Sequence, residues 1–394
     1  MKTATLLLAL WPCHVHAATI DAGAGISVRL KTRVGSAISK AGDPIQAEVI
    51  APVRNGGRII VWPGTLLNGT VKTATPAPSA TGRALLLLDF DSLAGSGNTV
   101  NIKTIVAGVD NAREKVDANG NILGIVASET YSAMLDREIG QKWGGFLENI
   151  KKSLFEEPDS EILMDAGVEL TVRVLANVDW NGAPGPAVWN PAVPPQPLID
   201  LVNAQPFQTI AEKPPKPSDI TNLMFLGTRE QIEAAFRAAG WTLALDTNRD
   251  SGFETFRALV EDRGYKEAPM SSLLLDGRKP DMNWEKQFDT FARRHHLRIF
   301  ARPAGYNGSP VWVASSTHDN GISFSRQDRT FIHRVVSRID DERDKVVSDL
   351  TYTGKVRTVY YVDRPAVPKQ LSNATGDTLT TDGRMAVIAL AENP

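Results

Sequence analysis

The sequence contains one cysteine, Cys13, in 394 residues. This cysteine lies in an amino-terminal stretch that we expect to be removed, so the mature chain has no disulfide and no thiol nucleophile. A zinc site that includes a thiolate is excluded for the same reason. Without disulfides, an exported chain depends on its hydrophobic cores, which suits a bacterial periplasm better than a small secreted scaffold.

Several other signatures are absent from the sequence. No GxSxG, P-loop or GxGxxG pattern occurs, so serine-hydrolase, nucleoside-triphosphatase and dinucleotide chemistry have no support. The formal net charge is only −2, which gives no argument for nucleic acid or an anionic membrane as a partner. No later stretch approaches the roughly 18 apolar residues of a membrane-spanning helix. We therefore expect no cofactor, no nucleic acid and no membrane span.

The amino terminus, MKTATLLLALWPCHVHAATIDAG, has the pattern of a secretory leader. A lysine is followed by an apolar run over 3–11 and by a small-x-small cleavage site at 15–17. We expect cleavage after this site, which makes residues 1–17 a signal peptide and the protein periplasmic. A lipid anchor on Cys13 is disfavoured, since Pro12 occupies the position where a small residue is needed.

The sequence predicts a β-barrel-like domain over residues 23–180. Short β-branched runs such as ISVRLKTRV and GRIIVWPGTLLNGTVKTA alternate with turn-rich segments such as KAGD and RNGG. Strands at this spacing are typical of a barrel or sandwich. Within the domain, apolar residues at helical spacing predict a helical insert over 128–158.

Three segments of this domain, SAISKAGDPIQAEVIAPV, GGRIIVWPGTLLNGTV and ILMDAGVELTVRV, combine turn glycines with apolar strands. In these segments the domain loosely resembles the β-barrel domain of TrbI-type conjugation and secretion scaffold proteins. The resemblance implies a periplasmic barrel and not a secretion role. A generic β-domain is the alternative.

Residues 181–217 hold ten of the 24 prolines of the chain. Such density favours extended polyproline II segments and disfavours regular strand ladders. We therefore expect a proline-rich linker over 181–217, with a docking peptide for a proline-reading domain as the alternative.

The remaining sequence predicts an α+β domain over 218–365. Thr228 and Gln231 form a capping-box pattern before a helical face, and a second helix follows. A run of strands, a helix from about Asp340 and a last strand complete the domain. Helices before a run of strands favour an α+β layer fold over a doubly wound sheet. Residues 366–394 are expected to form a flexible tail.

Five segments of this domain place polar residues at fixed offsets between apolar strands. They are PSDITNLMFLGTREQIEAAFRAAGW, SSLLLDGRKPDMNWEKQ, RRHHLRIFARP, GSPVWVASSTHDNGISFS and IHRVVSRIDDERDKVVSDL. In these segments, residues 217–352 resemble the LssY carboxy-terminal domain family, which is often fused to membrane phosphatase-type or transport-type domains. The resemblance implies a domain identity and a cell-envelope context, but no reaction.

Two adjacent histidines in RRHHLRIF, residues 293–300, raise the functional question. Neighbours in a strand point to opposite faces, so His295 and His296 cannot jointly bind one metal ion. His295 shares its face with apolar residues and is expected on the core side. His296 shares its face with Arg298, and we expect this pair on the functional side.

Three interpretations compete for the polar residues of these strands. In a phosphoester hydrolase, arginines hold a phosphate, a histidine transfers protons and an aspartate orients the histidine. The candidate catalytic residues are His296, Arg298, His318, Asp319 and His333. A metal site of His296, His318, His333 and Asp319 has suitable ligand types but no tight motif spacing, so no metal is expected. In the third interpretation these side chains are buried and satisfied by acids of the terminal helix.

A bias towards arginine favours a binding role. Between residues 293 and 338 there are eight arginines and two aspartates, with no lysine or glutamate. The planar arginine fork suits carboxylates, phosphates and interfaces. We expect Arg294, Arg298 and Arg302 to form a binding face for an envelope protein or an anionic ligand. The leading hypothesis is a non-enzymatic, exported binding or scaffold module; the phosphoester hydrolase is the alternative, and the oligomeric state is open.

Overall fold

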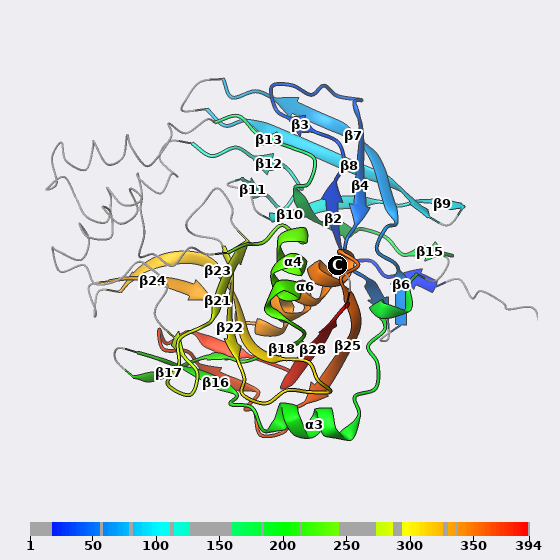
Figure 1. Ribbon diagram of the computed structural model, residues 1–394. Coiled ribbons are helices and arrows are strands. Elements are labelled where there is room, and N and C mark those ends of the chain that lie inside the picture. The colour runs from blue at the N-terminus through cyan, green and yellow to red at the C-terminus, as the bar shows by residue number, and fades with distance from the viewer. Residues whose placement is uncertain are drawn as a thin grey trace, which may run out of the picture.

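The computed structural model describes residues 18–392 except for 56–57, 79–81, 96, 111–113, 127–159, 183–184, 213–214, 244–272, 287–293, 326–329 and 336. At 294, 319–325 and 330–335 only the backbone is described. The described residues form two large β-sheets with few helices (Figure 1). The predicted fold class, a barrel-like β-domain followed by an α+β domain, is confirmed. The predicted signal peptide and helical insert lie outside the described residues.

The first sheet has nine strands and is barrel-like. Its order is β10-β14-β2-β4-β7-β8-β12-β11, with β9 beside β8. These strands are β2 (Gly25–Leu30), β4 (Pro44–Val49), β7 (Leu66–Thr75), β8 (Leu85–Gly95), β9 (Asn98–Asn101), β10 (Thr104–Asp110), β11 (Lys115–Val116), β12 (Ile122–Leu123) and β14 (Glu169–Val174). Although β10 and β11 stand at opposite ends of this order, β10 also lies against β8 and β11. The sheet therefore nearly closes on itself.

Alternating side chains fill the inside of the first sheet. Every second residue of β2 and β4 is buried, as expected for strands with one face on a core. Val28, Leu67 and Phe90 are among the fully buried members of this core. Three short strand pairs accompany the sheet. They are β1 (Ala18–Ile20) with β15 (Val178–Trp180), β3 (Val34–Gly35) with β13 (Leu163–Met164), and β5 (Val53–Asn55) with β6 (Arg58–Val61).

The second sheet has eight strands in the order β19-β21-β22-β23-β18-β28-β25, with β24 beside β23. These strands are β18 (Leu223–Leu226), β19 (Thr242–Leu243), β21 (Met282–Lys286), β22 (Arg294–Ala301), β23 (Val311–Ser325), β24 (Thr330–Val335), β25 (Val356–Asp363) and β28 (Arg384–Leu390). β18 and β28 are parallel. Two smaller sheets lie beside it. They consist of β16 (Gln208–Ala211), β17 (Lys216–Ile220) and β20 (Leu273–Leu274), and of β26 (Gln370–Ser372) with β27 (Thr378–Thr380).

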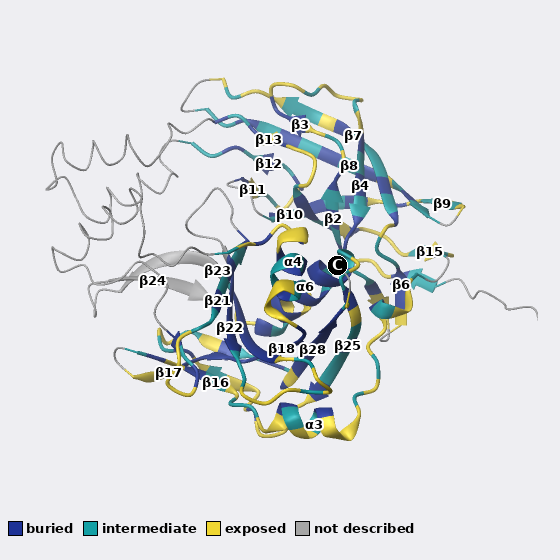
Figure 2. Ribbon diagram, viewed as in Figure 1, coloured by how far each residue is buried: buried dark blue, intermediate teal, exposed yellow. Residues whose placement is uncertain are grey.

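Helices cover both faces of the second sheet. α4 (Arg229–Ala238) and α6 (Ile339–Tyr352) share one core with Phe225 of β18. α3 (Gln196–Asn203) shares the core of the other face with Met224. The strands between them are buried, whereas the outer side of α3 is exposed (Figure 2). This part of the molecule is therefore a three-layer α+β arrangement.

α4 begins at the predicted capping box. The backbone N–H of Thr228 donates to Gln231 Oε1 at 2.7 Å, and the N–H of Gln231 donates to Thr228 Oγ1 at 3.3 Å. Two otherwise unpaired donors of the first turn are satisfied in this way. Gly240 follows the helix with a φ of 79°, a conformation that glycine adopts without strain. The helix start predicted from the sequence is confirmed here.

The expected extended linker over 181–217 is wrong for much of its length. It contains the short helix η3 (Ala187–Trp189), all of α3 and β16, and the start of β17. Pro195 caps α3 and a second proline lies in its first turn, where a missing N–H is harmless because that donor has no helical partner. The prediction relied on the number of prolines and overlooked the apolar face of α3, whose residues Leu198 and Val202 are buried against the second sheet.

The expected flexible tail over 366–394 is also wrong. β28 lies between β18 and β25 in the second sheet, and six of its seven residues are buried. Its sequence, RMAVIAL, is a continuous apolar run, which is typical of a strand with both faces covered. The last strand is therefore a central part of the second sheet.

Candidate functional site

β22 places its side chains alternately on the two faces of the second sheet. Leu297 and Ile299 belong to the core under α4 and α6, whereas Phe300 belongs to the core under α3. Because side chains alternate along a strand, His295 lies on the α6 side and His296 on the α3 side. Both histidines are buried. The core-side position of His295 is confirmed, but His296 does not lie on an exposed functional face.

The strand register separates the predicted catalytic residues. In the antiparallel pair of β22 and β23, His295 is opposite His318, and His296 is opposite Thr317. Directly opposite residues share a face of the sheet, so His318 and His296 lie on opposite faces. The expected site that combines His296, Arg298 and His318 is therefore not formed. By backbone register Asp319 lies beside Arg294, and His333 beside Ile322; the side chains of these four residues are not described.

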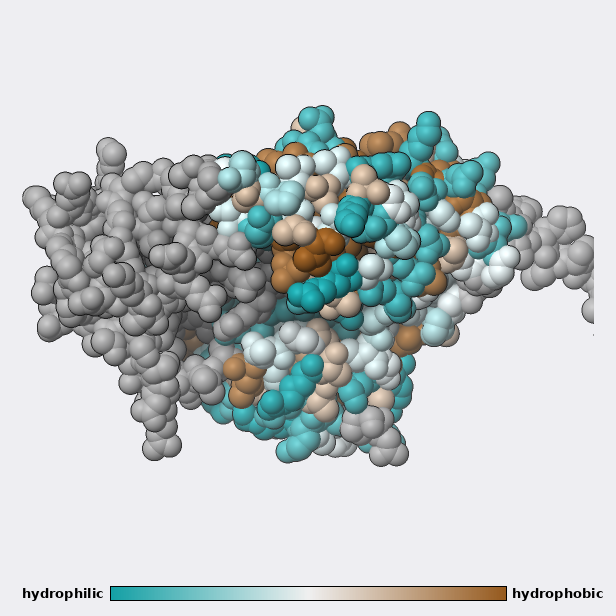
Figure 3. Space-filling model, turned by 90° about the horizontal axis from the view of Figure 1, so that it is seen from above, coloured by the Kyte–Doolittle hydropathy of each residue, from teal (hydrophilic) through white to brown (hydrophobic). Residues whose placement is uncertain are grey.

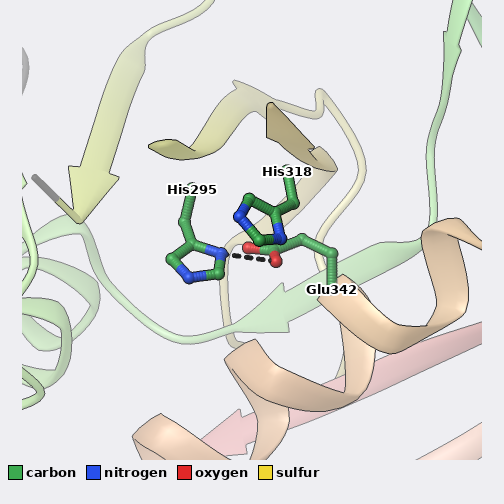
Figure 4. Close-up of side chains that lie close together, drawn as sticks. All are labelled: His295, His318 and Glu342. Carbon is green, nitrogen blue, oxygen red and sulfur yellow. Dashed lines mark hydrogen bonds and ion pairs between the residues drawn. The ribbon is translucent and has the colours of Figure 1, made fainter. Parts of the chain in front are cut away.

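The register instead brings His295 and His318 together with Glu342 of α6 (Figure 4). The two imidazole rings have centroids 4.3 Å apart, and His295 Nδ1 lies 2.6 Å from Glu342 Oε2. One nitrogen or oxygen atom of each residue lies within 4.8 Å of the others. His295 and Glu342 are buried and His318 is half-buried. Two imidazoles and a carboxylate are ligands that suit zinc and related ions.

The third interpretation, buried side chains satisfied by acids of the terminal helix, fits the contact of His295 with Glu342. The meeting of both histidines with Glu342 was not predicted, for two reasons. Glu342 stands in the first turn of α6, where acids are explained by the helix dipole alone. The meeting of His295 and His318 depends on which residues of β22 and β23 pair, and that register is a non-local property. A signal was present, since both histidines follow the apolar alternation of the same sheet face.

The predicted arginine face is not formed by Arg298. Arg298 Nη1 donates to Asp219 Oδ2 at 3.1 Å, and both side chains are buried. Arg302 donates to Gln205 Oε1 at 2.8 Å and to Asp276 Oδ2 at 2.7 Å. The two described arginines of this face therefore serve intramolecular contacts, and Arg298 is not accessible to a partner. The side chain of Arg294 is outside the described residues.

The order of elements from β16 to β28, with the capping box, the β22–β23 pair and α6, agrees with the family resemblance seen in the sequence. Residues 204–385 match the LssY C-terminus family. The resemblance of this part of the chain to that family is thereby confirmed. We call residues 204–385 the LssY C-terminus region. The match includes α4, α6 and the histidine strands, and ends inside β28.

Comparison with solved structures and with curated proteins gives no further family assignment. The solved structure of ComB10 of the Com Type IV secretion system of Helicobacter pylori is similar to 40% of this chain and 88% of its own, with 11% identity and a TM-score of 0.23. A TM-score this low does not establish a shared fold. No curated protein matches the chain. Every helix in the described part of the chain is too short or too polar to span a membrane.

Glu169 of β14 joins the first sheet to the LssY C-terminus region. Its carboxylate is 2% exposed and accepts hydrogen bonds from three cations: Arg29 of β2 at 2.7 Å, Lys345 of α6 at 2.7 Å and Lys286 of β21 at 3.0 Å. Asp349 of α6 binds the same two lysines, at 2.9 and 3.0 Å. A buried ionic cluster thus links strands of both sheets to α6.

The cluster changes the pKa values of its members. Burial would raise the pKa of Glu169, but the charges of Lys345 and Lys286 and the hydrogen bonds hold it well below its usual range. Burial would lower the pKa of Lys345, but Asp349 and Glu169 raise it instead. Burial raises the pKa of nearby Asp110, and Lys345 offsets part of this effect. Glu169, Asp349 and Lys345 are therefore charged at neutral pH.

Acid is expected to lower the free energy of unfolding through its effect on this cluster. The folded-state pKa values of Glu169 and Asp349 are depressed. Their contribution to the free energy of unfolding is therefore present above the ordinary carboxyl range and is lost as pH falls through that range towards the folded values. Asp110, with its raised pKa, opposes this trend in part. Urea unfolding should give a lower midpoint at about pH 3 than at about pH 7. Equal midpoints would contradict the account.

A cleft of about 360 Å³ lies where the first sheet meets α6 and β25. Both parts of the chain line it. The charged residues that line the cleft are four aspartates and two cations. The aspartates are Asp110, Asp341, Asp344 and Asp349, and the cations are Arg54 and Lys345. The side chains of Asp341 and Asp344 are 56% and 51% exposed. Arg54 is exposed as well, so the accessible charges of the cleft are those of two aspartates and one arginine, with an acidic excess.

Proposed function

We propose that the protein is a non-enzymatic binding module of the bacterial cell envelope, exported to the periplasm, whose ligand is a basic segment of another envelope protein. The observation that carries the proposal is the cleft between the first sheet and the LssY C-terminus region. In this account the two parts act as one body, and neither provides the cleft alone.

The charge of the side chains that line the cleft favours a basic ligand. The cleft presents more aspartates than cations, and its best exposed acids, Asp341 and Asp344, stand in the first turns of α6. Complementary charge at an accessible surface favours encounter with an oppositely charged segment. On the face that Figure 3 shows, groups of apolar side chains, one of them near the centre, lie among polar ones.

This proposal differs from the sequence-based expectation of an anionic ligand on an arginine face. That expectation required accessible arginines, whereas Arg298 is buried against Asp219. The phosphoester hydrolase is not favoured, because His296 and His318 lie on opposite sheet faces. The binding role is retained, with its location moved to the cleft and the charge of its ligand reversed.

Charge reversal at Asp341 is expected to weaken binding of a lysine-rich peptide. The probe is a fluorescein-labelled peptide of alternating lysine and glycine, with a glutamate–glycine peptide for comparison, measured by anisotropy at low salt. Asp341→Lys should raise the Kd about tenfold, since an attractive exposed contact becomes a repulsive one. The matched control is Asp165→Lys, because Asp165 is also an exposed aspartate paired with an exposed arginine, Arg33.

Three outcomes contradict the proposal. They are absence of binding to the lysine peptide by the wild-type protein, equal weakening by the Asp341 and Asp165 variants, and tighter binding of the glutamate peptide. Preferential binding of the lysine peptide that is lost only in the Asp341 variant supports it.

A further inference from the structure

We propose that His295, His318 and Glu342 bind one divalent transition-metal ion of the zinc class. The three residues come from β22, β23 and α6, and their candidate ligand atoms lie within 4.8 Å of one another. In a tetrahedral zinc site, donors about 2.1 Å from the ion are about 3.4 Å apart. Metal binding therefore requires side-chain rotations that draw the donors together from separations of up to 4.8 Å. The inference does not depend on the binding role proposed for the cleft.

A buried carboxylate oxygen provides an independent argument. Glu342 is 4% exposed, and its Oε2 lies 2.6 Å from His295 Nδ1. Its other oxygen, Oε1, is buried and has no hydrogen-bond partner among the described residues. A buried acceptor without a hydrogen-bond partner is unfavourable, and such atoms in native structures commonly contact a water molecule or an ion. The hydrogen bond with His295 therefore satisfies only one of the two carboxylate oxygens of Glu342.

The position of His318 also favours metal binding. Its ring lies 4.3 Å from that of His295, with 33° between the planes, and Figure 4 shows the carboxylate of Glu342 next to both rings. Two imidazoles held this closely beside a carboxylate present converging lone pairs when both rings are neutral. His318 is half-buried while the other two ligands are buried, so an ion can enter from its side.

The scaffold holds the ligands in place before binding. His295 and His318 are directly opposite in a regular antiparallel ladder, and the ring of Trp241 lies 6.0 Å from that of His295. Ligands fixed by rigid elements lose little conformational freedom when the metal binds. The set, with two nitrogens and one oxygen, suits zinc, cobalt or iron(II) and not calcium or magnesium, which prefer oxygen ligands alone.

The neighbouring cations do not oppose the ion strongly. Lys286 is opposite His295 on the adjacent strand, and Lys345 lies one helical turn from Glu342. Each ammonium group is already held by the carboxylates of Glu169 and Asp349. Binding at His295 Nδ1 displaces any proton shared with Glu342 and releases it to solvent, so the reaction is a metal-for-proton exchange.

The test is cobalt and zinc titration of the purified, untagged full chain after treatment with a chelator. We expect one equivalent of Co²⁺ to bind with the visible absorption of a low-coordinate site, Zn²⁺ to displace it, and binding to weaken as pH falls. His318→Ala and Glu342→Gln should each lower zinc affinity about 100-fold or more. His296→Ala is the matched control, since it removes the adjacent buried histidine on the opposite sheet face, and it should leave the affinity unchanged.

Far-ultraviolet circular dichroism checks that each variant is folded, and His318→Gln replaces His318→Ala if the latter is not. The inference is overturned if the folded wild-type protein binds no cobalt or zinc, if His318 variants bind as tightly as wild type, or if His296→Ala weakens binding as much as they do. Loss of peptide binding in the Asp341 variant, with metal binding intact, keeps the two proposals separate.

Discussion

A chain that ends after Gly383 is expected not to fold its second sheet. Residues 384–390 form β28, which pairs with β18 on one side and β25 on the other. Removing it deletes Met385, Val387 and Ile388 from the cores of both faces. Each such side chain contributes about 1.5–3 kcal/mol by burial, so the sum is comparable with the whole stability of a domain, about 5–15 kcal/mol.

The measurement is soluble yield, near-ultraviolet circular dichroism and thermal unfolding of the truncated chain. The control ends after Leu390 and keeps β28 complete; it should behave like the full chain. Native near-ultraviolet spectra and a cooperative transition in the shorter chain would contradict the central position of β28.

Glu169→Gln is expected to lower the free energy of unfolding by about 3–5 kcal/mol, because it removes one of the two carboxylates that Lys286 and Lys345 share in a buried site. Asp349 still contacts both lysines, but one carboxylate then faces two ammonium groups. The loss should be measured by urea unfolding at neutral pH. The acid dependence described above should also become shallower in this variant, because one of the two depressed carboxyls is gone.

Glu233→Gln is the control for this substitution. Glu233 also pairs with two cations, Arg229 and Arg237, but its partners are on the exposed side of α4. Exposed pairs of this kind contribute about 0–1 kcal/mol. A Glu169 variant that loses no more than the Glu233 variant would show that burial of the cluster has little energetic effect.

Local patterns predicted much of this architecture. The β-branched runs ISVRLKTRV and GRIIVWPGTLLNGTVKTA predicted strands of the first sheet, and Thr228 with Gln231 predicted the start of α4. The alternation of RRHHLRIF predicted that His295 faces the core. In each case the deciding physics acts within a few residues, so a single segment contains the necessary information.

The remainder depended on pairings between distant segments. Nothing local to RMAVIAL says that it inserts between β18 and β25, and nothing local to Glu169 says that it meets Lys286 and Lys345. The same holds for His318, whose partner is set by the register of β22 and β23. Proline density was misleading, because prolines at the start of α3 are compatible with a helix.

A buried ionic cluster joins the first sheet and the LssY C-terminus region into one body. A double-mutant cycle of Glu169→Gln and Lys286→Gln tests it most directly, because these partners come from the two parts and lie 3.0 Å apart. Unfolding free energies of the two single variants, the double variant and the wild type should give a coupling energy of about 2 kcal/mol. Additive effects, within about 0.5 kcal/mol, would contradict the claim.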